Sequence, residues 1–355
     1  MMDGALDEEV SLVGLTEDMG VNAVLFGFVG LYALTFPGRV RACYLVGSHA
    51  TSEAVGESDL DLTLVFKDTF LPGEEARFER FRMAVGPLAR YPLDLNAVEE
   101  ARLVAEGEVN LKQNALLIAG EDVRDRVPLM PLEAWTRHCM HQPYRFIERA
   151  RARAEDAPLR FPLEYPDARG ELYGYDYREV MDAQGQLHRG FKELVTLACR
   201  MATAAVALDA GRHTFSKRDA IQAHREHVHD TWTPLYESIF ASRQQWGYRV
   251  PDDAAARAKL REACARMLDA ENAFLARYRD FLLAEVTRGR VEDRVLAARR
   301  LGDIAYPGED VSRALQRLVE APEPSEPVDL ALREAARESL ARLARHRGDR
   351  ASSAA

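Results

Sequence analysis

Two carboxylates stand at the start of a strand-like segment, and they constrain the fold of this chain more than any other feature. Residues 59–66 read Asp-Leu-Asp-Leu-Thr-Leu-Val-Phe, so polar and apolar residues alternate before the segment becomes fully apolar. Alternate residues of a strand point to the same face, so Asp59 and Asp61 project together while Leu60 and Leu62 enter a core. Carboxylates held this close repel each other unless a cation lies between them. The segment predicts a buried strand that presents an acidic pair.

A glycine-serine turn precedes this strand. Residues 41–46 form a β-rich run that ends at Gly47 and Ser48. Gly47 lets the backbone approach a phosphate closely, and Ser48 offers an N–H and a hydroxyl to phosphate oxygens. Magnesium binds one or two carboxylates together with substrate phosphate oxygens. The turn and the acidic pair together favour a metal–nucleotide site.

A third acid, Asp94, lies inside the next predicted strand, residues 91–98. It could take a proton from an acceptor hydroxyl or complete a second metal site, and both roles stay open. An isolated aspartate at a strand end is also a common turn former. With the Gly-Ser turn and the acidic pair, this acid favours an in-line displacement at an α-phosphate.

Residues 46–66 resemble the polymerase-β-type nucleotidyltransferase signature, in which a Gly-Ser turn is followed some ten residues later by Asp-x-Asp. The resemblance implies that Gly47 and Ser48 grip the triphosphate of ATP or another nucleoside triphosphate. It also implies that Asp59 and Asp61 coordinate Mg²⁺ and that Asp94 acts as base or as an additional metal ligand.

A second resemblance concerns residues 194–221. They are similar to the helical C-terminal domain of streptomycin/spectinomycin-type aminoglycoside adenylyltransferases, where a helix leads through Gly to a Ser-Lys turn that opens the next helix. Here Ser216 is the expected N-cap, and the resemblance implies that Lys217 neutralises triphosphate charge, with Lys192 as a second candidate. Those enzymes are shorter and typically use glutamate in place of Asp94, so their acceptor is not carried over to this chain.

The order of the predicted elements indicates an α+β protein. An N-terminal nucleotidyltransferase-like α/β domain with a small mixed sheet is expected over 1–125, because strand signals almost vanish after residue 99. An all-helical domain that closes over the nucleotide is expected over 126–288. A short HEAT-like helical extension follows over 289–346, and 347–355 are expected to fray.

Composition narrows the partners and the compartment. The chain has 355 residues with 47 Lys and Arg against 57 Asp and Glu, a net charge of −10 that argues against a dedicated duplex nucleic-acid binder and suits a small cationic acceptor. The uncharged run 23–36 is shorter than the roughly 18 residues that a membrane span needs, so we expect a buried helix and no membrane association. The start of the chain lacks the pattern of a secretion signal, which indicates a cytoplasmic protein.

Three further groups of residues have competing interpretations. We interpret the histidines of residues 224–229 as solvated surface and the tyrosines of residues 165–177 as residues that pack a proline-containing loop. The C-terminal helices either cap the preceding domain or offer a basic stripe to an anionic protein partner. The arginines of that stripe are Arg299, Arg300, Arg313 and Arg317.

These features together predict a Mg²⁺-dependent transferase that moves a nucleoside monophosphate, AMP from ATP by resemblance, to a hydroxyl of a small cationic acceptor such as an aminoglycoside and releases pyrophosphate. One alternative is a toxin-like nucleotidyltransferase that acts on RNA or on a protein. Another is a non-catalytic nucleotide-binding scaffold. Retention of both Asp59 and Asp61 argues against the scaffold, because such a protein has no need for two mutually repelling carboxylates.

Overall fold

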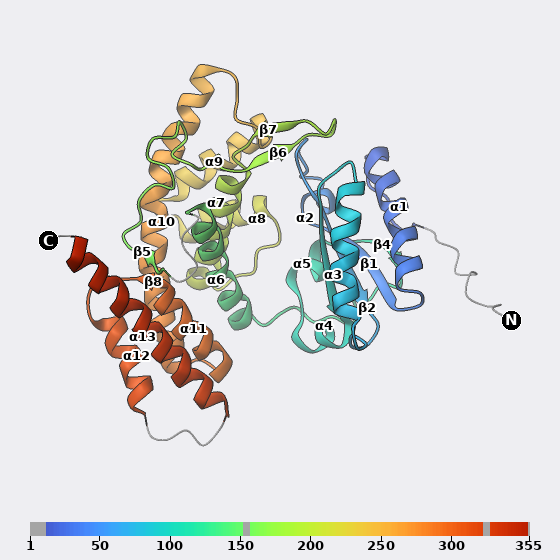
Figure 1. Cartoon of the computed structure of the whole chain (residues 1–355). Helices are drawn as coiled ribbons and strands as arrows, with labels where there is room; N and C mark the ends of the chain where they lie inside the picture. The colour runs from blue at the N-terminus through green and yellow to red at the C-terminus, as the bar shows by residue number, and fades with distance from the viewer. Residues whose placement is uncertain (1–11, 152–156, 322–326, 354–355) are drawn as a thin grey trace. The chain divides into compact units, whose positions relative to one another are not determined.

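A computed structural model describes residues 12–151, 157–321 and 327–353 of the chain (Figure 1). Residues 1–11 and the final two residues of the predicted tail lie outside this described part. The architecture is α+β, with a small mixed sheet of four strands and many helices, as predicted.

The sheet has the strand order β3-β2-β1-β4. Strands β2 and β3 run parallel, whereas β1 pairs antiparallel with both β2 and β4. Strands β1, β2 and β3 correspond to the three segments that the sequence predicts as strands. The bounds of the four strands are β1 Val40–Val46, β2 Leu60–Phe66, β3 Leu93–Glu99 and β4 Leu116–Gly120.

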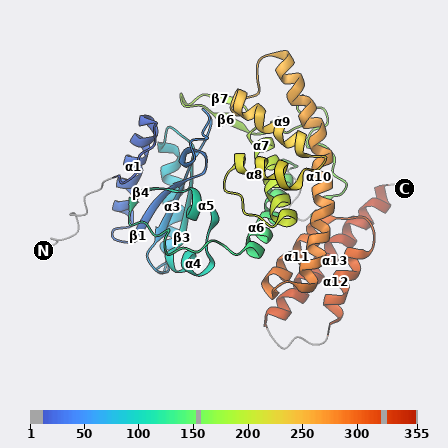
Figure 2. The same ribbon diagram turned by 180° about the vertical axis from the view of Figure 1, so that it is seen from behind.

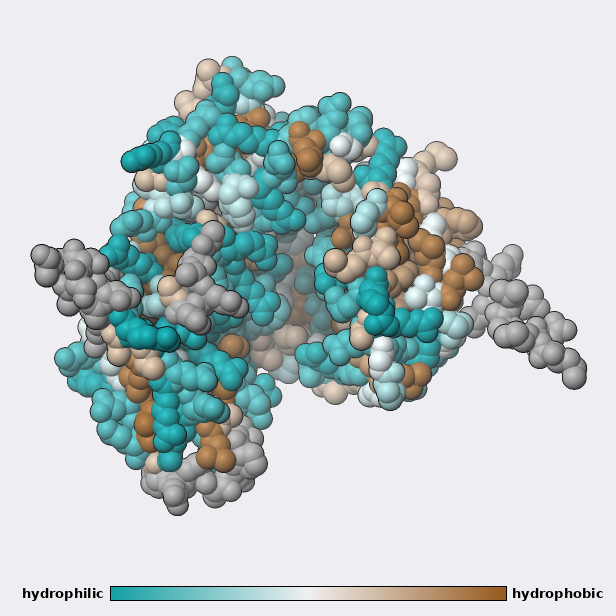
Figure 3. All heavy atoms as spheres, in the orientation of Figure 1, coloured by the Kyte–Doolittle hydropathy of each residue, from teal (hydrophilic) through white to brown (hydrophobic). Residues whose placement is uncertain are grey.

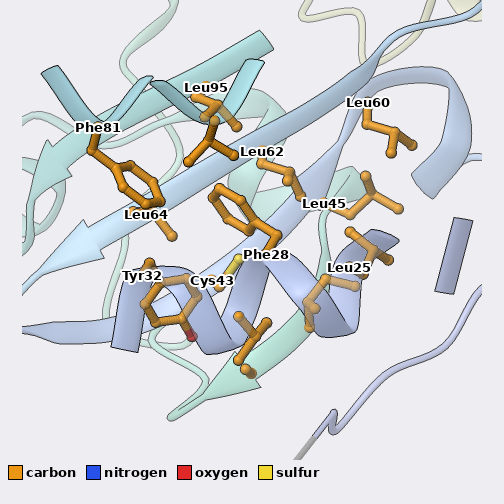
Figure 4. Close-up of a cluster of buried hydrophobic side chains, with 14 of the residues drawn as sticks. Leu25, Phe28, Tyr32, Cys43, Leu45, Leu60, Leu62, Leu64, Phe81 and Leu95 are labelled. Carbon is orange, nitrogen blue, oxygen red and sulfur yellow. The ribbon is translucent and has the colours of Figure 1, made fainter. Parts of the chain in front are cut away.

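One face of the sheet carries the main hydrophobic core (Figure 4). The alternation in β2 sends Leu60, Leu62 and Leu64 to this face, where they meet α1 (Met19–Thr35) and α3 (Glu74–Val85). All three leucines are fully buried. Their burial fixes the register of β2 and thereby sends Asp61 to the opposite face.

The opposite face of the sheet carries short helices (Figure 2) and a smaller apolar cluster. Val65 of β2 packs there with Leu103 of α4 (Glu100–Glu106) and Leu111 of α5 (Val109–Asn114). Asp61 lies nearer the beginning of the same strand and is outside this apolar cluster. One half of the face is therefore a core, and the other half carries carboxylates.

Helix α1 is buried on one side only. Leu25 and Phe28 enter the core, as expected for the uncharged run 23–36, but Met19, Phe26 and Leu34 are exposed. Apolar atoms accordingly gather on the surface over α1 and α3 in the space-filling view (Figure 3). The helix lies where it is predicted, but only one side of it is buried, because a helix lying on a sheet contacts it along a single stripe.

By internal packing, the chain divides into two units, and each is built from two stretches of sequence. Unit 1 comprises Met1–Cys139 with Asp176–Arg257, and unit 2 comprises Met140–Tyr175 with Ala258–Ala355. The predicted domains are continuous stretches of sequence, whereas each of these units combines two separate stretches.

The second stretch of unit 1 is a short hairpin followed by a helical layer. Helix α7 packs against α8 and α9. Sequence analysis missed the hairpin, whose turn is held by Asp182: its Oδ1 accepts hydrogen bonds from the backbone N–H groups of Gln184 and Gln186, both at 2.9 Å. The elements are β6 Glu179–Met181, β7 Leu187–Arg189, α7 Lys192–Ala205, α8 Lys217–Ala223 and α9 Thr233–Trp246.

Unit 2 is mainly helical. Its segment 157–175 packs down as predicted for the tyrosine-containing loop, since the rings of Tyr165 and Tyr173 stack with centroids 4.3 Å apart. Glu271, fully buried on α10, binds Arg151 Nη2 at 2.5 Å and accepts a hydrogen bond from Tyr175 Oη at 2.8 Å. The hydrogen bond from Tyr175 thus attaches the loop to α10, and the ion pair attaches Arg151, the residue after α6, to the same carboxylate.

The C-terminal helices form a small bundle in which α13 packs against α11 and α12. Gly302 permits this close approach, because a Cβ there would overlap Ser339. Helix α13 continues to Ser353, beyond the predicted end of the ordered chain at residue 346. Helix α6 begins in unit 1, and the first residues of α10 also belong to unit 1. The elements that lie wholly or mainly in unit 2 are α6 Leu132–Ala150, β5 Leu159–Arg160, α10 Ala254–Arg288, α11 Val291–Asp303, β8 Ile304–Ala305, α12 Asp310–Glu320 and α13 Pro327–Ser353.

No helix in the described part of the chain combines the length and the apolar character needed to cross a membrane.

Candidate active site

The three predicted aspartates meet at one end of two parallel strands. Asp59 immediately precedes β2, Asp61 is its second residue, and Asp94 lies in β3 as the direct cross-strand partner of Asp61. Because paired residues of neighbouring strands project to the same face, Asp61 and Asp94 share the half of the sheet that the apolar cluster leaves open. The structure therefore brings together acids that are more than 30 residues apart in sequence.

The Gly-Ser turn lies against this acidic group. Gly47 has a positive φ of 71° and begins α2 (Gly47–Ala50) directly after β1. A Cβ at this position would overlap the carboxylate of Asp61. Glycine is thus required twice, once by backbone conformation and once by the approach of Asp61. The Ser48 hydroxyl in the same turn makes no hydrogen bond with any residue that the structure describes, which leaves it free for a ligand.

The two aspartates of the pair differ in their electrostatic surroundings. Burial works to raise the pKa of Asp59, but the charge and hydrogen bond of Lys192, helped by Lys217, more than offset it, and the pKa is lowered. The pKa of Asp61 is raised to about 7, because burial and the negative charges of Asp59 and Asp94 outweigh the positive charges of Lys217 and Lys192. Asp61 accepts no hydrogen bond from a side chain or N–H in the described ranges. It is a shielded carboxylate that no cation in these ranges contacts directly.

Both predicted lysines open helices that face this acidic pair. Lys192 is the first residue of α7, and its Nζ lies 2.8 Å from Asp59 Oδ2. Lys217 is the first residue of α8, and the predicted N-cap is confirmed, since Ser216 Oγ accepts from the Asp219 N–H at 3.1 Å. No hydrogen bond or ion pair joins the Lys217 ammonium to another described residue.

Two arginines join Lys217 to form a cationic cluster that sequence analysis did not find. Burial and the charges of Arg243 and Arg200 work to lower the pKa of Lys217, whereas Tyr248 and Cys199 act in the opposite direction, and the net shift is upward. Neither arginine forms an ion pair with a carboxylate among the described residues. Arg243 is only 2% exposed and donates to Tyr248 Oη at 2.9 Å and to the Glu53 carbonyl at 2.6 Å. This cluster of Lys217, Arg200 and Arg243 is positive charge that no carboxylate neutralises directly.

Residues 51–58, which connect the Gly-Ser turn to Asp59, are clamped to the helical layer. Ser216 Oγ donates to Glu53 Oε1 at 2.9 Å. Glu57 Oε2 accepts from the Tyr248 N–H at 3.1 Å, and Glu57 Oε1 pairs with Arg249 Nε at 2.5 Å. The segment that positions Asp59 is therefore itself positioned by the N-cap of α8 and by the residues that follow α9.

The chemistry of the donor set suits a hard divalent cation. Across the described ranges, no group of three or more His, Cys, Asp or Glu side chains is arranged to hold a metal ion. Asp59, Asp61 and Asp94 nevertheless supply only carboxylate oxygens, the ligands that Mg²⁺ prefers. Burial and the charges of Asp59 and Asp94 raise the pKa of Asp61, and a bound divalent cation would lower it. The residues present therefore fit Mg²⁺.

Two other sequence interpretations change with the structure. His224 is not solvated surface but 1% exposed, with Nδ1 3.1 Å from Thr233 Oγ1, because the chain after α8 continues in a wider helical turn that folds this ring inward. Arg300 of the predicted basic stripe is not free either, since it pairs with Asp303 at 3.1 Å and covers the ring of Tyr144. Arg299, Arg313 and Arg317 remain exposed.

The same sequence was compared with known proteins. No protein-family model and no curated protein sequence matches this chain.

Proposed function

We propose that this protein is a Mg²⁺-dependent nucleotidyltransferase that transfers a nucleoside monophosphate to an acceptor hydroxyl and releases pyrophosphate. One observation carries the proposal: within the described part of the chain, no cation contacts the Asp61 carboxylate and no carboxylate contacts the Lys217 ammonium, although the two groups lie within electrostatic reach of each other. Unmatched buried charge is costly, and natural sites retain it where a ligand supplies the opposite charge.

A magnesium nucleoside triphosphate carries both of the missing charges. The metal would be held by Asp59 and Asp61, and it would supply charge neutralisation between the carboxylates and the phosphate oxygens. The triphosphate would face Lys217 and its neighbouring arginines, with Lys192 close by. By resemblance, Gly47 and Ser48 would contact the phosphates, and ATP would be the donor.

The reaction needs a base that takes the proton from the acceptor hydroxyl. An acceptor oxygen attacks the α-phosphorus, the bond from that phosphorus to the bridging oxygen breaks, and pyrophosphate leaves with the bond's electron pair. Asp94 is the member of the acidic group that is exposed on an edge strand, where a second substrate can approach. It would take the hydroxyl proton or, alternatively, hold a second metal ion.

The surroundings of Asp94 support a small cationic acceptor. Asn96 on the same strand is exposed beside it, and the chain as a whole carries a net charge of −10. Negative charge in and around a site raises the local concentration of a cationic substrate and speeds its association. An aminoglycoside-like polyamine has the hydroxyls and the charge that this edge would receive.

Pyrophosphate release from each of the four nucleoside triphosphates with Mg²⁺, with and without a panel of aminoglycosides, tests the proposal. We expect release that depends on one acceptor and is lost in both Asp59→Asn and Asp61→Asn. Asp125→Asn is the matched control, because it makes the same chemical change at an exposed position of unit 1. Magnesium-dependent binding without turnover would move the acceptor to a macromolecule, and absence of nucleotide binding would overturn the proposal.

A further inference from the structure

The ammonium of Lys192 forms an ion pair with Asp59, one of the carboxylates that the proposed function assigns to a metal ion. Its Nζ lies 2.8 Å from Asp59 Oδ2, and the two side chains are 14% and 28% exposed. Nζ is close enough to share the Oδ2 lone pairs that a metal would use. A cation of the protein itself thus lies against Asp59.

The location of this lysine is not one that helix formation favours. Lys192 is the first residue of α7, where the helix dipole favours an acid and disfavours a positive charge. Asp59 offsets this cost in the ligand-free chain. An anionic ligand at the same end of the helix would offset it as well.

A second contact shows where Lys192 remains anchored when it leaves Asp59. Nζ lies 5.4 Å from the ring centroid of Tyr248, within the range of a cation–π interaction. Tyr248 is itself fixed, because its hydroxyl accepts from Arg243 Nε at 2.9 Å and its N–H donates to Glu57 at 3.1 Å. The aromatic face is a rigid support from which a flexible lysine side chain can turn to a different partner.

We propose that Lys192 is an exchangeable counter-ion of Asp59, which neutralises this carboxylate in the empty site and gives it up when a divalent cation binds together with a nucleotide. The inference rests on the proposed function and adds an order of events to it. A metal ion alone has to displace the ammonium and leaves it without an anion. A metal ion that arrives with a triphosphate brings a new partner for the ammonium. Metal and nucleotide should therefore bind cooperatively, and metal alone should bind weakly.

The test measures Mn²⁺ binding to the full chain without nucleotide. The electron paramagnetic resonance signal of free Mn²⁺ reports how much of the metal is bound. Lys192→Met should bind Mn²⁺ more tightly than the wild type, by on the order of tenfold, because it no longer competes for Asp59. Lys192→Arg keeps the charge and should show no comparable gain. Lys217→Met removes a nearby lysine that is not paired with Asp59, so its smaller gain measures the general effect of losing one positive charge.

A second measurement uses a non-hydrolysable triphosphate. Adding it should tighten Mn²⁺ binding to the wild type strongly and to Lys192→Met much less, and Asp59→Asn in the Lys192→Met background should remove the gain seen without nucleotide. If Lys192→Met does not fold, Lys192→Gln serves in its place, with folding checked by circular dichroism.

The outcomes separate this inference from the proposed function. Wild-type protein that binds Mn²⁺ with nucleotide, together with Lys192→Met and Lys192→Gln variants that gain nothing beyond Lys217→Met, would show that the ion pair is only structural and would overturn the inference alone. If neither wild type nor variant binds Mn²⁺ under any condition, both the inference and the proposed function fail.

Discussion

At the residue scale, the site depends on the mutual fit of Gly47 and Asp61. The positive φ of Gly47 and the absence of a side chain allow the turn after β1 to lie against a carboxylate that strand β2 delivers to the same place. Neither residue has an alternative position, because the buried leucines fix the register of β2. The acidic pair and the Gly-Ser turn are therefore one structural feature.

Gly47→Ala should destabilise the protein by at least about 2 kcal/mol, since it adds backbone strain and an overlap with Asp61. Gly56→Ala is the matched control: that glycine has open space around a Cβ and should change stability by less than about 0.5 kcal/mol. Urea unfolding of both variants measures the difference. Equal stability of the two variants would contradict the described geometry.

The raised pKa of Asp61 makes a prediction about pH. Its folded-state pKa of about 7 exceeds the unfolded value of 3.8, so the folded state binds more protons between these two pH values. Stability of the ligand-free protein should therefore fall as pH rises from about 4 to about 7. Asp61→Asn should remove this part of the fall and, at pH 8, be more stable than the wild type by on the order of 1–3 kcal/mol. Unfolding curves at pH 5 and pH 8 test this, and a variant less stable than wild type at pH 8 would refute it.

At the element scale, the connection between β1 and β2 links the sheet to the helical layer. Glu53 and Glu57 in this connection are held by Ser216, Arg243, Tyr248 and Arg249, all of which come from the layer of α7 to α9 or the segment after it. The helices therefore determine where Asp59 lies, as well as supplying cations.

Arg243→Met should be strongly destabilising, by about 2–4 kcal/mol, because the buried Tyr248 hydroxyl loses its donor and the Glu53 carbonyl loses a hydrogen bond. Arg225→Met is the comparison variant, as its ion pairs with Glu226 and Glu237 are exposed and should contribute little. Chemical denaturation distinguishes the two. If Arg243→Met loses no more stability than Arg225→Met, the hydrogen bonds of Arg243 do not hold the connection between β1 and β2 in place.

The strands and the acidic pair could be predicted from sequence because they rest on local patterns. Period-two alternation located β2, and a short run before Gly47 located β1. The hairpin β6–β7 escaped because each strand has only three residues, too few to show a period. Arg200 and Arg243 escaped because arginine is common in this chain and tertiary packing alone sets them beside Lys217. His224 was misread because polar neighbours in sequence suggested a surface helix.

At the scale of the whole molecule, the candidate site belongs to unit 1, and unit 2 has a stabilising feature of its own. Glu271 is fully buried and forms an ion pair with Arg151, whose side chain is 10% exposed. Such a pair contributes to stability mainly through the penalty for breaking it. It attaches the end of α6 to α10, and Tyr175 at the end of the loop 157–175 donates a hydrogen bond to the same carboxylate.

Glu271→Ala should cost about 3–5 kcal/mol, since it leaves Arg151 buried without an anion. Hydrogen exchange of the full chain should then be faster in the loop and in α10, while Glu262→Ala at an exposed position of the same helix should leave exchange unchanged. Unaltered exchange in Glu271→Ala would contradict the assigned role of the pair.

The central claim is that Asp59 and Asp61 on one side, and Lys217 with its arginines on the other, receive the two charges of a metal nucleotide. The direct measurement is calorimetric binding of ATP and the other nucleoside triphosphates, with Mg²⁺ and with a chelator, to wild type, Asp59→Asn/Asp61→Asn and Lys217→Met. We predict that Mg²⁺ strengthens binding to the wild type but not to the double aspartate variant, and that Lys217→Met weakens binding under both conditions. Binding that is indifferent to Mg²⁺ and to both sets of substitutions, or no binding of any nucleotide, would contradict the account.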